Sequence, residues 1–277
     1  MKRVLFFLLT IGLCVGSVQA DDMVRQLQVR LKNGGFYHGD ANGVYDEETA
    51  VAVARYQIRN GLPISAEMDA TTLHALGLKP RGTTKTEEPA PVAGAWRRLR
   101  NGDMQFVENA NDGKIPPPKP STQADHSSPQ SGRARPAPPA STEPAVSTQA
   151  SDFSDKERLR EYVGAFILAG LDPQTGAELE FFADRVNYFG ERNMSREKVR
   201  ADLVRYARRW PERRFWLAGD IEVASQPDGK VQVTFPLRYE LRNGSKSASG
   251  KVMKTLVLRQ TGGNDLEIVE VSERKAG

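Results

Sequence analysis

The sequence predicts an α+β protein in which a small helical unit comes first and a mixed unit, helices followed by a sheet, comes last. Three observations support this prediction. Apolar residues recur at helical spacing before residue 77, proline, serine and threonine dominate residues 80–151, and apolar and polar residues alternate after residue 230. Helical spacing predicts amphipathic helices, and alternation predicts strands with one buried face.

The start of the chain predicts export. A basic pair at residues 2–3 precedes an apolar run over 4–15, and Val18-Gln19-Ala20 offers the small residues that a signal peptidase requires. We expect a signal peptide over residues 1–20 and a periplasmic or secreted protein with no stable membrane span after cleavage; an uncleaved anchor is the alternative. The only cysteine, Cys14, lies in this run, so the mature chain would contain no thiol.

The next segment predicts three short helices. Apolar residues repeat every three or four positions over 24–31 and again over 52–56, and a shorter third helix is expected over 72–76. Gly35 suits the end of the first helix because glycine accepts the left-handed conformation of a helix stop. Asp46 and Asp69 are placed to cap the second and third helices.

A series of motifs runs through these helices and the turns between them. Its members are Val24, Leu27, Gln28, Leu31, Gly35, Phe36, Tyr37, Gly39, Asn42, Gly43, Val44, Tyr45, Thr49, Ala52, Val53, Tyr56, Gln57, Gly61, Leu62, Asp69, Thr72, Leu73 and Leu76. The series resembles the small peptidoglycan-binding domain of bacterial wall enzymes. The resemblance covers residues 21–79 and implies peptidoglycan as the partner and association with the cell wall.

The resemblance also implies which side chains bind the wall. Tyr37 and Tyr45 are candidates to stack on sugar rings, with polar contacts from Gln28, Arg55 and Gln57. Core packing is the alternative role for Tyr45, and a glycan or a stem peptide both remain open as the ligand.

Three departures from the family pattern concern the backbone. Asp46 and Ala66 stand where the family often has glycine, and Asn42 stands where it usually has aspartate. Asn42 tolerates left-handed backbone and Asp46 gains a capping role, so strain is expected only at Ala66.

Residues 80–151 predict an extended, disordered linker because a segment so rich in proline, serine and threonine buries too little apolar surface to offset its ordering entropy. Trp96 and the patch 104–107 interrupt it, on either side of Asn101-Gly102, a hairpin turn signal. We favour a weakly structured island in a tether over a docking motif.

The C-terminal segment, 152–277, begins with helical patterns. Ser154 and Glu157 have the spacing of a capping box for a helix that ends near Ala169. A second helix is expected through 179–182 and a third from its cap at Ser195 to the stop at Trp210-Pro211.

The helices are followed by strands. One strand is marked by alternating apolar residues, namely Val231, Val233, Phe235, Leu237, Tyr239 and Leu241. Segments 250–259 and 266–271 add two more, giving a curved antiparallel meander. Pro236 predicts an edge or a bulge, since proline cannot donate to a ladder.

The order of these elements resembles the cone-shaped fold of nuclear transport factor 2, ketosteroid isomerase and SnoaL-like proteins. The resemblance is carried by Phe181-Phe182-Ala183-Asp184, Val186, Tyr188, the helix after Ser195, the stop at Trp210-Pro211 and the long final strands. It implies a module that binds a ligand or partner, or forms a homodimer through its outer sheet face. This architecture hosts many functions.

Composition excludes some classes of function. A net charge of +4 and a pI near 9.1 do not indicate a nucleic-acid-binding protein. The three histidines, His38, His74 and His126, form no metal-ligand motif, so we expect no metal and no cofactor. The leading hypothesis is a wall-anchored module without catalysis. The alternative is an isomerase or hydrolase with its active site in the cone cavity, for which the resemblance nominates Asp184, Tyr188, Tyr206 and Glu240.

Overall fold

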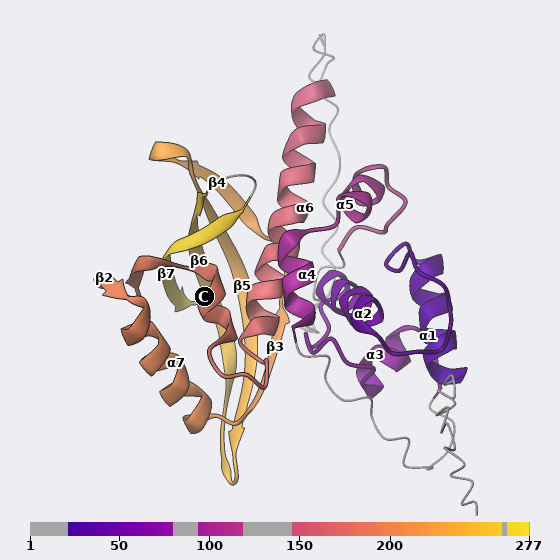
Figure 1. Cartoon of the computed structure of the whole chain (residues 1–277), viewed down its shortest axis with the longest axis horizontal. Coiled ribbons are helices and arrows are strands. Elements are labelled where there is room, and N and C mark those ends of the chain that lie inside the picture. Colours follow the sequence, from indigo (N-terminus) through magenta and orange to yellow (C-terminus); the bar gives the residue numbers. More distant parts are fainter. Residues whose placement is uncertain (1–21, 80–93, 119–145, 262–264, 277) are drawn as a thin grey trace, which may run out of the picture.

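The computed structural model describes residues 22–79, 94–118, 146–261 and 265–276. The predicted signal peptide lies outside the described residues. The fold is α+β, as predicted: a helical unit and a sheet unit lie on opposite sides of the long helix α6 (Val146–Ala169), as Figure 1 shows.

The helical unit consists of α1 (Asp22–Asn33), α2 (Glu47–Asn60) and α3 (Ala70–Ala75). Both predicted caps form: Thr49 N donates to Asp46 Oδ1 over 2.9 Å, and Thr72 N donates to Asp69 Oδ1 over 2.8 Å. Gly35, which follows α1, has a φ of 77°. These local signals were sufficient because each depends only on residues within four positions of the helix end.

The sheet unit contains seven strands in one mixed sheet, in the order β2-β1-β7-β6-β5-β3, with β4 also paired to β5. The strands are β1 (Phe182–Tyr188), β2 (Glu191–Ser195), β3 (Glu212–Leu217), β4 (Glu222–Gln226), β5 (Lys230–Asn243), β6 (Lys246–Gln260) and β7 (Leu266–Lys275). Strands β1 and β7 run parallel, whereas the other pairs are antiparallel. The predicted meander therefore covers β5 to β7; β1 pairs parallel to β7, and β2 forms the edge beyond it.

Strand β5 buries the predicted face, with Val233 and Phe235 both fully buried. Pro236 lies inside the sheet, at the point where the partner of β5 changes from β4, whose register ends at Thr234, to β3, whose register begins at Leu237. Ala218 N donates to Pro236 O over 2.9 Å at this break. Pro236 is therefore tolerated without a bulge, because it lies where the ladder already changes partner.

Two predicted helices differ in the structure. Residues Ala177–Phe181 form a single 3-10 turn, η1, and the chain then enters β1 at Phe182. A short apolar run fits a buried strand as well as a helix, and parallel pairing with β7 decides for the strand. Helix α6 begins at Val146 and continues through the predicted cap at Ser154. The third predicted helix, α7 (Arg196–Arg209), follows Ser195 as expected.

The predicted linker needs correction at residues 94–118. These residues form α4 (Ala95–Asn101) and α5 (Met104–Asn111), and Gly102 caps α4 where a β-hairpin was expected. Trp96 is 1% exposed, so it is a docking residue and no part of a loose tether. The remainder of the predicted linker, 80–93 and 119–145, lies outside the described residues.

The helical and sheet units pack directly against each other. Ile58 of α2 lies so close to Gly164 of α6 that a Cβ at position 164 would lie 2.2 Å from Ile58 Cδ1. Ile64 N donates to Phe215 O of β3 over 2.9 Å. One buried cluster contains residues of α2, α4, α6 and the sheet. The two units therefore form one packed body across α6.

Replacement of Trp96 by alanine should release α4. The variant loses a buried indole, which costs about 3–5 kcal/mol, and with it the hydrogen bond from Trp96 Nε1 to Asp172 Oδ2. We expect limited proteolysis to cut within residues 94–118 of Trp96→Ala and to spare that segment in the wild type. Phe189→Ala, which removes a 43% exposed ring, is the control. Equal protection of this segment in all three proteins would contradict the docking role of Trp96.

Candidate functional site

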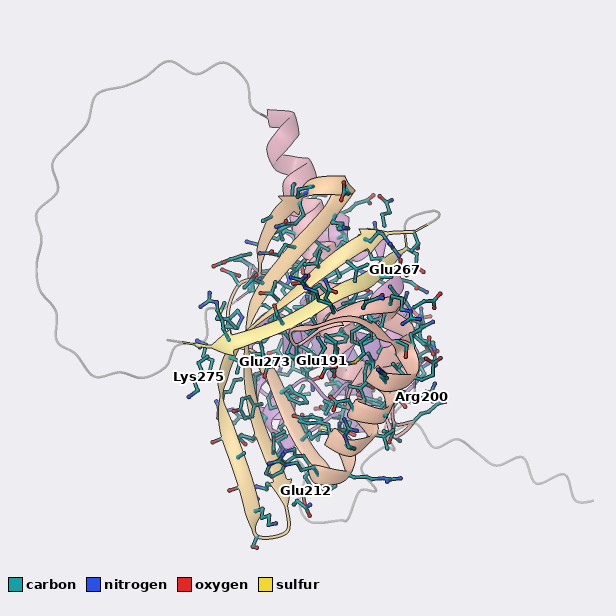
Figure 2. The ribbon with its side chains drawn as sticks, turned by 90° about the vertical axis from the view of Figure 1, so that its left-hand side faces the viewer. Glu191, Arg200, Glu212, Glu267, Glu273 and Lys275 are labelled. Atoms are coloured by element: carbon teal, nitrogen blue, oxygen red, sulfur yellow. The ribbon has the colours of Figure 1, made fainter. Side chains whose placement is uncertain are left out.

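A cavity of about 470 Å³ opens on the inner face of the sheet, beside α7. Figure 2 views the molecule from the side on which β7 and α7 lie, with Glu273 and Arg200 labelled on them. The walls of the cavity are mainly apolar and aromatic: Phe166, Ile167, Phe182, Leu203, Trp210, Phe215, Leu237, Leu241, Val252 and Val271. An apolar cavity with few polar groups is the usual form of a small-molecule site.

Charged side chains line this cavity on α7, at Asp202 and Arg209, and at two further places. On the strands, Lys254 Nζ lies 3.4 Å from Glu273 Oε2. Burial lowers the pKa of Lys254, and the nearby Glu273 carboxylate opposes this effect. At the other place Glu178 is 7% exposed, and burial raises the pKa of its carboxyl group against the opposing effect of Arg213. The buried charges of Lys254 and Glu178 thus lie in low-dielectric surroundings, where a polar ligand group would interact strongly with them.

Two of the four candidate catalytic residues reach the cavity. Tyr188 and Tyr206 line it, and burial raises the pKa of both phenols. Asp184 does not: its side chain is 92% exposed and lies 3.6 Å from Arg196. Glu240 lies on the opposite face of β5, where Arg238 NH2 donates to Glu240 Oε1 over 2.7 Å. The structure therefore brings together the two tyrosines and separates both carboxylates from them.

Sequence reasoning missed the charged residues of the cavity. Lys254 pairs with Phe235 across β5 and β6, so it faces the same inner side as the apolar residues of these strands. The sequence does contain a signal for Lys254. It interrupts the alternating apolar pattern at an inward position between Val252 and Leu256. Glu273 is its cross-strand partner on β7.

In the helical unit, the buried side chain of Gln28 forms hydrogen bonds with the loop between α1 and α2. It is fully buried, its Nε2 donates to Val44 O and Thr49 Oγ1, each over 3.0 Å, and its Oε1 accepts from Gly43 N over 2.8 Å. All of these partners belong to the chain itself. Gln28 therefore holds the loop between α1 and α2.

Gln57 repeats this arrangement one helix later. Its Oε1 accepts from Ser65 N over 3.0 Å and from Ala66 N over 2.9 Å, and its Nε2 donates to Thr72 Oγ1 over 3.0 Å. Ala66, where the family has glycine, adopts a φ of 56°, in the left-handed region that disfavours a Cβ. Gln57 and its bonds to the loop hold this conformation in place.

The two candidate stacking tyrosines are held inside as well. Tyr37 is 3% exposed and its hydroxyl donates to Asp40 O over 3.1 Å. The hydroxyl of Tyr45 donates to Ala66 O over 2.7 Å. Neither tyrosine therefore offers an open ring face on which a sugar could stack. Only an edge of the Tyr37 ring is accessible, from a pocket that it lines.

Arg55, the last of the five candidates for wall contact, instead joins the two units. Its Nε donates to Glu161 Oε1 of α6 over 2.5 Å, its NH1 lies 3.2 Å from Asp103 Oδ2, and its guanidinium carbon lies 4.8 Å from the centre of the Phe106 ring. Arg59 continues the contact one turn later, 3.4 Å from Glu157. The charged face of α2 is therefore directed at α6.

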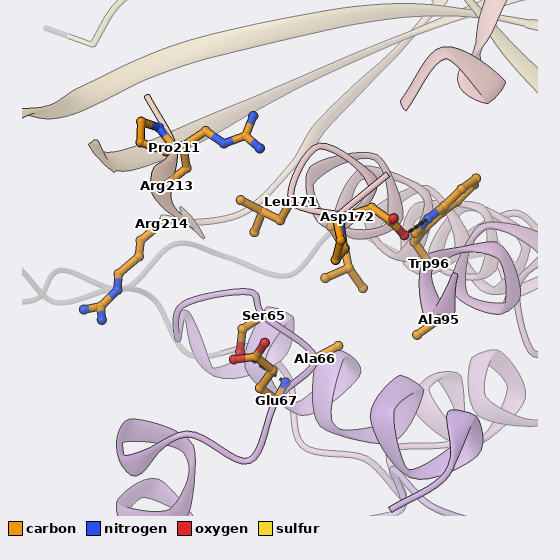
Figure 3. Close-up of a pocket in the computed structure, with 12 residues that line it drawn as sticks. Ser65, Ala66, Glu67, Ala95, Trp96, Leu171, Asp172, Pro211, Arg213 and Arg214 are labelled. Atoms are coloured by element: carbon orange, nitrogen blue, oxygen red, sulfur yellow. Dashed lines mark hydrogen bonds between the residues drawn. The ribbon is translucent and has the colours of Figure 1, made fainter. Parts of the chain in front are cut away.

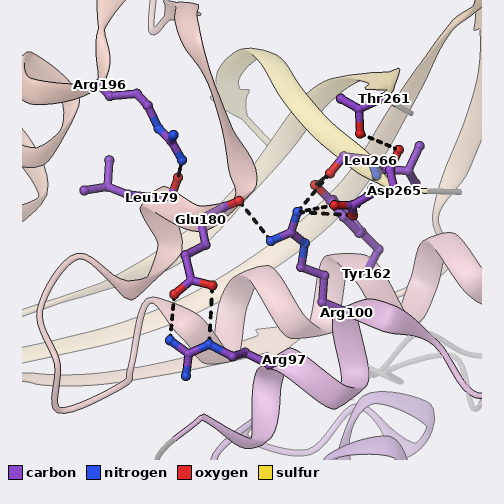
Figure 4. Close-up of polar contacts among 9 residues, drawn as sticks. All are labelled: Arg97, Arg100, Tyr162, Leu179, Glu180, Arg196, Thr261, Asp265 and Leu266. Atoms are coloured by element: carbon purple, nitrogen blue, oxygen red, sulfur yellow. Dashed lines mark hydrogen bonds and ion pairs between the residues drawn. The ribbon is translucent and has the colours of Figure 1, made fainter. Parts of the chain in front are cut away.

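Helix α4 holds the same junction from the other side. Arg97 donates two hydrogen bonds to the carboxylate of Glu180, over 2.6 and 3.3 Å, and Arg100 donates to Glu180 O and Asp265 Oδ1 (Figure 4). A groove of about 260 Å³ lies between the 65–67 loop and residues 171–173. Figure 3 shows Trp96 bonded to Asp172 beside it. The segment 94–118 thus ties the helical unit to the sheet unit.

Comparison with known proteins assigns the helical unit. Residues 20–76 match the family described as "Putative peptidoglycan binding domain". The matched range covers all three helices of the unit. No curated protein matches the chain.

Solved structures similar to this chain match less than half of it. ActVI-ORFA from Streptomyces coelicolor is 13% identical over 42% of this chain and 92% of its own, with a TM-score of 0.37. An NTF2-like protein with a cystatin-like fold from Novosphingobium aromaticivorans is 15% identical over 46% of this chain and 86% of its own, also with a TM-score of 0.37. Residues 20–76 thus match a peptidoglycan-binding domain family, and the strands that follow α6 form one mixed sheet in an α+β unit.

Among the described residues, no three histidine, cysteine or acidic side chains are grouped closely enough to hold a metal ion. None of the helices described is long and apolar enough to cross a bilayer.

The buried carboxyl of Glu161 should make stability depend on pH. Burial raises its pKa from 4.5 to about 7, although Arg55 acts in the opposite direction. Between these values the folded state keeps a proton that the unfolded chain has released, so the free energy of unfolding falls as pH rises through this window.

Urea unfolding between pH 5 and pH 8 measures this effect. We expect Glu161→Gln, which cannot titrate, to lose less stability over that range than the wild type. Glu108→Gln, at an exposed position on α5, should keep the wild-type dependence. An unchanged pH dependence in Glu161→Gln would show that the carboxyl does not titrate in this window.

Proposed function

We propose that this protein is exported and binds peptidoglycan through residues 22–79, and that it presents the cone unit as a binding module without catalysis. The observation that carries the proposal is the family match over residues 20–76. Further support comes from Gln28 and Gln57, whose internal hydrogen bonds preserve both turns of the domain. The cone supplies a second, apolar site of about 470 Å³ for a ligand or partner. The predicted homodimer through the outer sheet face stays a prediction.

Co-sedimentation with purified sacculi tests the wall-binding part. We expect the full chain to pellet with sacculi and to stay in solution when the sacculi are first digested to soluble muropeptides. Because the chain is basic, with a pI near 9.1, the assay is repeated at high salt, where attraction between exposed charges is screened. Pelleting that disappears at high salt and is matched at low salt by an unrelated protein of similar pI would indicate charge attraction alone and would contradict specific binding.

A variant whose cavity is filled by a larger side chain tests whether the cone unit binds a ligand there. We expect an apolar fluorescent dye to bind the wild type, and Val252→Trp, which places a large ring in the cavity wall, to bind it at least about tenfold more weakly. Val223→Trp, at a position 41% exposed on β4, is the control. Equal dye binding by both variants would show that the dye binds elsewhere.

An enzyme remains the second candidate because of one observation. Glu178 is buried with a raised pKa and lines the same cavity as Tyr188, which is an arrangement suited to acid and base chemistry. The incubated sacculi can be analysed for soluble muropeptides. Release by the wild type that is lost in Glu178→Gln would favour the enzyme over the binding module.

A further inference from the structure

A third pocket lies where the peptidoglycan-binding domain meets α4 and α5. It has a volume of about 370 Å³. The loop after α1 contributes Tyr37 and His38, α2 contributes Glu48 and Arg55, and the other wall comes from Arg98 and Asp103. The segment 94–118 therefore completes a pocket that the domain alone would leave open on one side.

Two basic residues of this pocket, His38 and Arg98, have no side-chain partner among the described residues, whereas Arg55 is paired. The ring nitrogen His38 Nε2 is buried and has no hydrogen-bond partner. Arg98 is exposed, and no hydrogen bond or ion pair to its guanidinium is present in the described part of the chain. Its neighbours Arg97 and Arg100 both bind carboxylates of the sheet unit. Arg98 is thus the arginine of α4 that the docking leaves available for a ligand.

Acidic groups line the same pocket. Glu48 lies near the hydroxyl of Tyr37, since both the Glu48 Oε1 and the Tyr37 hydroxyl lie within 3.1 Å of the position of a Cβ at Gly39. Asp103 is held by Arg55, 3.2 Å away. Each wall of the pocket therefore offers both signs of charge, His38 and Glu48 on one wall and Arg98 and Asp103 on the other, with the aromatic ring of Tyr37 beside them.

We propose that this composite pocket binds the free end of a stem peptide, where a carboxylate and an ammonium group belong to one amino acid. Arg98 and His38 receive the carboxylate, Glu48 and Asp103 receive the ammonium group, and Tyr37 contacts the aliphatic chain between them. The proposal rests on the proposed wall binding and names the part of the wall that is bound. A neutral glycan offers no partner for two opposite charges, which would then stay unpaired in the complex.

Calorimetry on the full chain tests this assignment. The probe is the tripeptide L-alanyl-γ-D-glutamyl-meso-diaminopimelate, and N,N′-diacetylchitobiose, the N-acetylated form of chitobiose, is the uncharged comparison. We expect the wild type to bind the tripeptide and not the disaccharide. Arg98→Gln and Glu48→Gln should each weaken the tripeptide affinity about tenfold or more, because each removes one charge-assisted contact. Arg30→Gln, with the same charge change at an exposed position on α1, should bind like the wild type.

A second readout locates the ligand. In proton NMR spectra the ring signals of His38 should move when the tripeptide is added, whereas those of His74 should not. Tripeptide affinity within about twofold of wild type in both pocket variants would overturn the assignment. So would a wild type that pellets with sacculi but binds only N,N′-diacetylchitobiose, and wall binding would then stand. A wild type that fails to pellet with sacculi overturns the proposed function itself.

Discussion

The contact of α2 with α6 determines the arrangement of the rest of the molecule. Gly164 lets Ile58 approach the axis of α6, and Arg55 then reaches Glu161 in a buried ion pair. Burying two charges is costly, and removing one partner costs more still, because the other is left without compensation. The pair thus contributes less to the free energy of folding than to the specificity of packing, because it fixes which face of α2 meets α6. The positions of α4 and of the pocket completed by Arg98 follow from this packing.

The elements that were predicted correctly from the sequence are those whose conformation is determined by residues nearby in the chain. Asp46 and Asp69 cap helices that begin at the next residue, and the alternation in β5 appears as a buried face. The elements that it missed depend on distant partners. Trp96 is a lone aromatic in a polar segment, and only Asp172 and Phe181, more than 70 residues away, make it a docking residue. The strand at Phe182 likewise requires β7.

The candidate residues show the same division. The motif residues of the small helical domain were identified correctly as a family pattern, yet Gln28 and Gln57 hold its loops, and Arg55 contacts the neighbouring unit. A motif reveals which residues a fold requires, and those residues are often internal. The charged residues on the pocket and cavity walls, such as Arg98 and Lys254, lie outside any motif, so their role emerges only when separate segments are brought together.

The paired glutamines divide the small domain into two similar halves. Gln28 with Asp46 and Thr49, and Gln57 with Asp69 and Thr72, form the same helix-and-loop unit twice. The two units differ in their surroundings. Val44 in the first loop is exposed to solvent, whereas Ala66 in the second is buried near the sheet unit. A larger side chain at Val44 therefore extends into solvent, while one at Ala66 is constrained by the junction between the helical and sheet units.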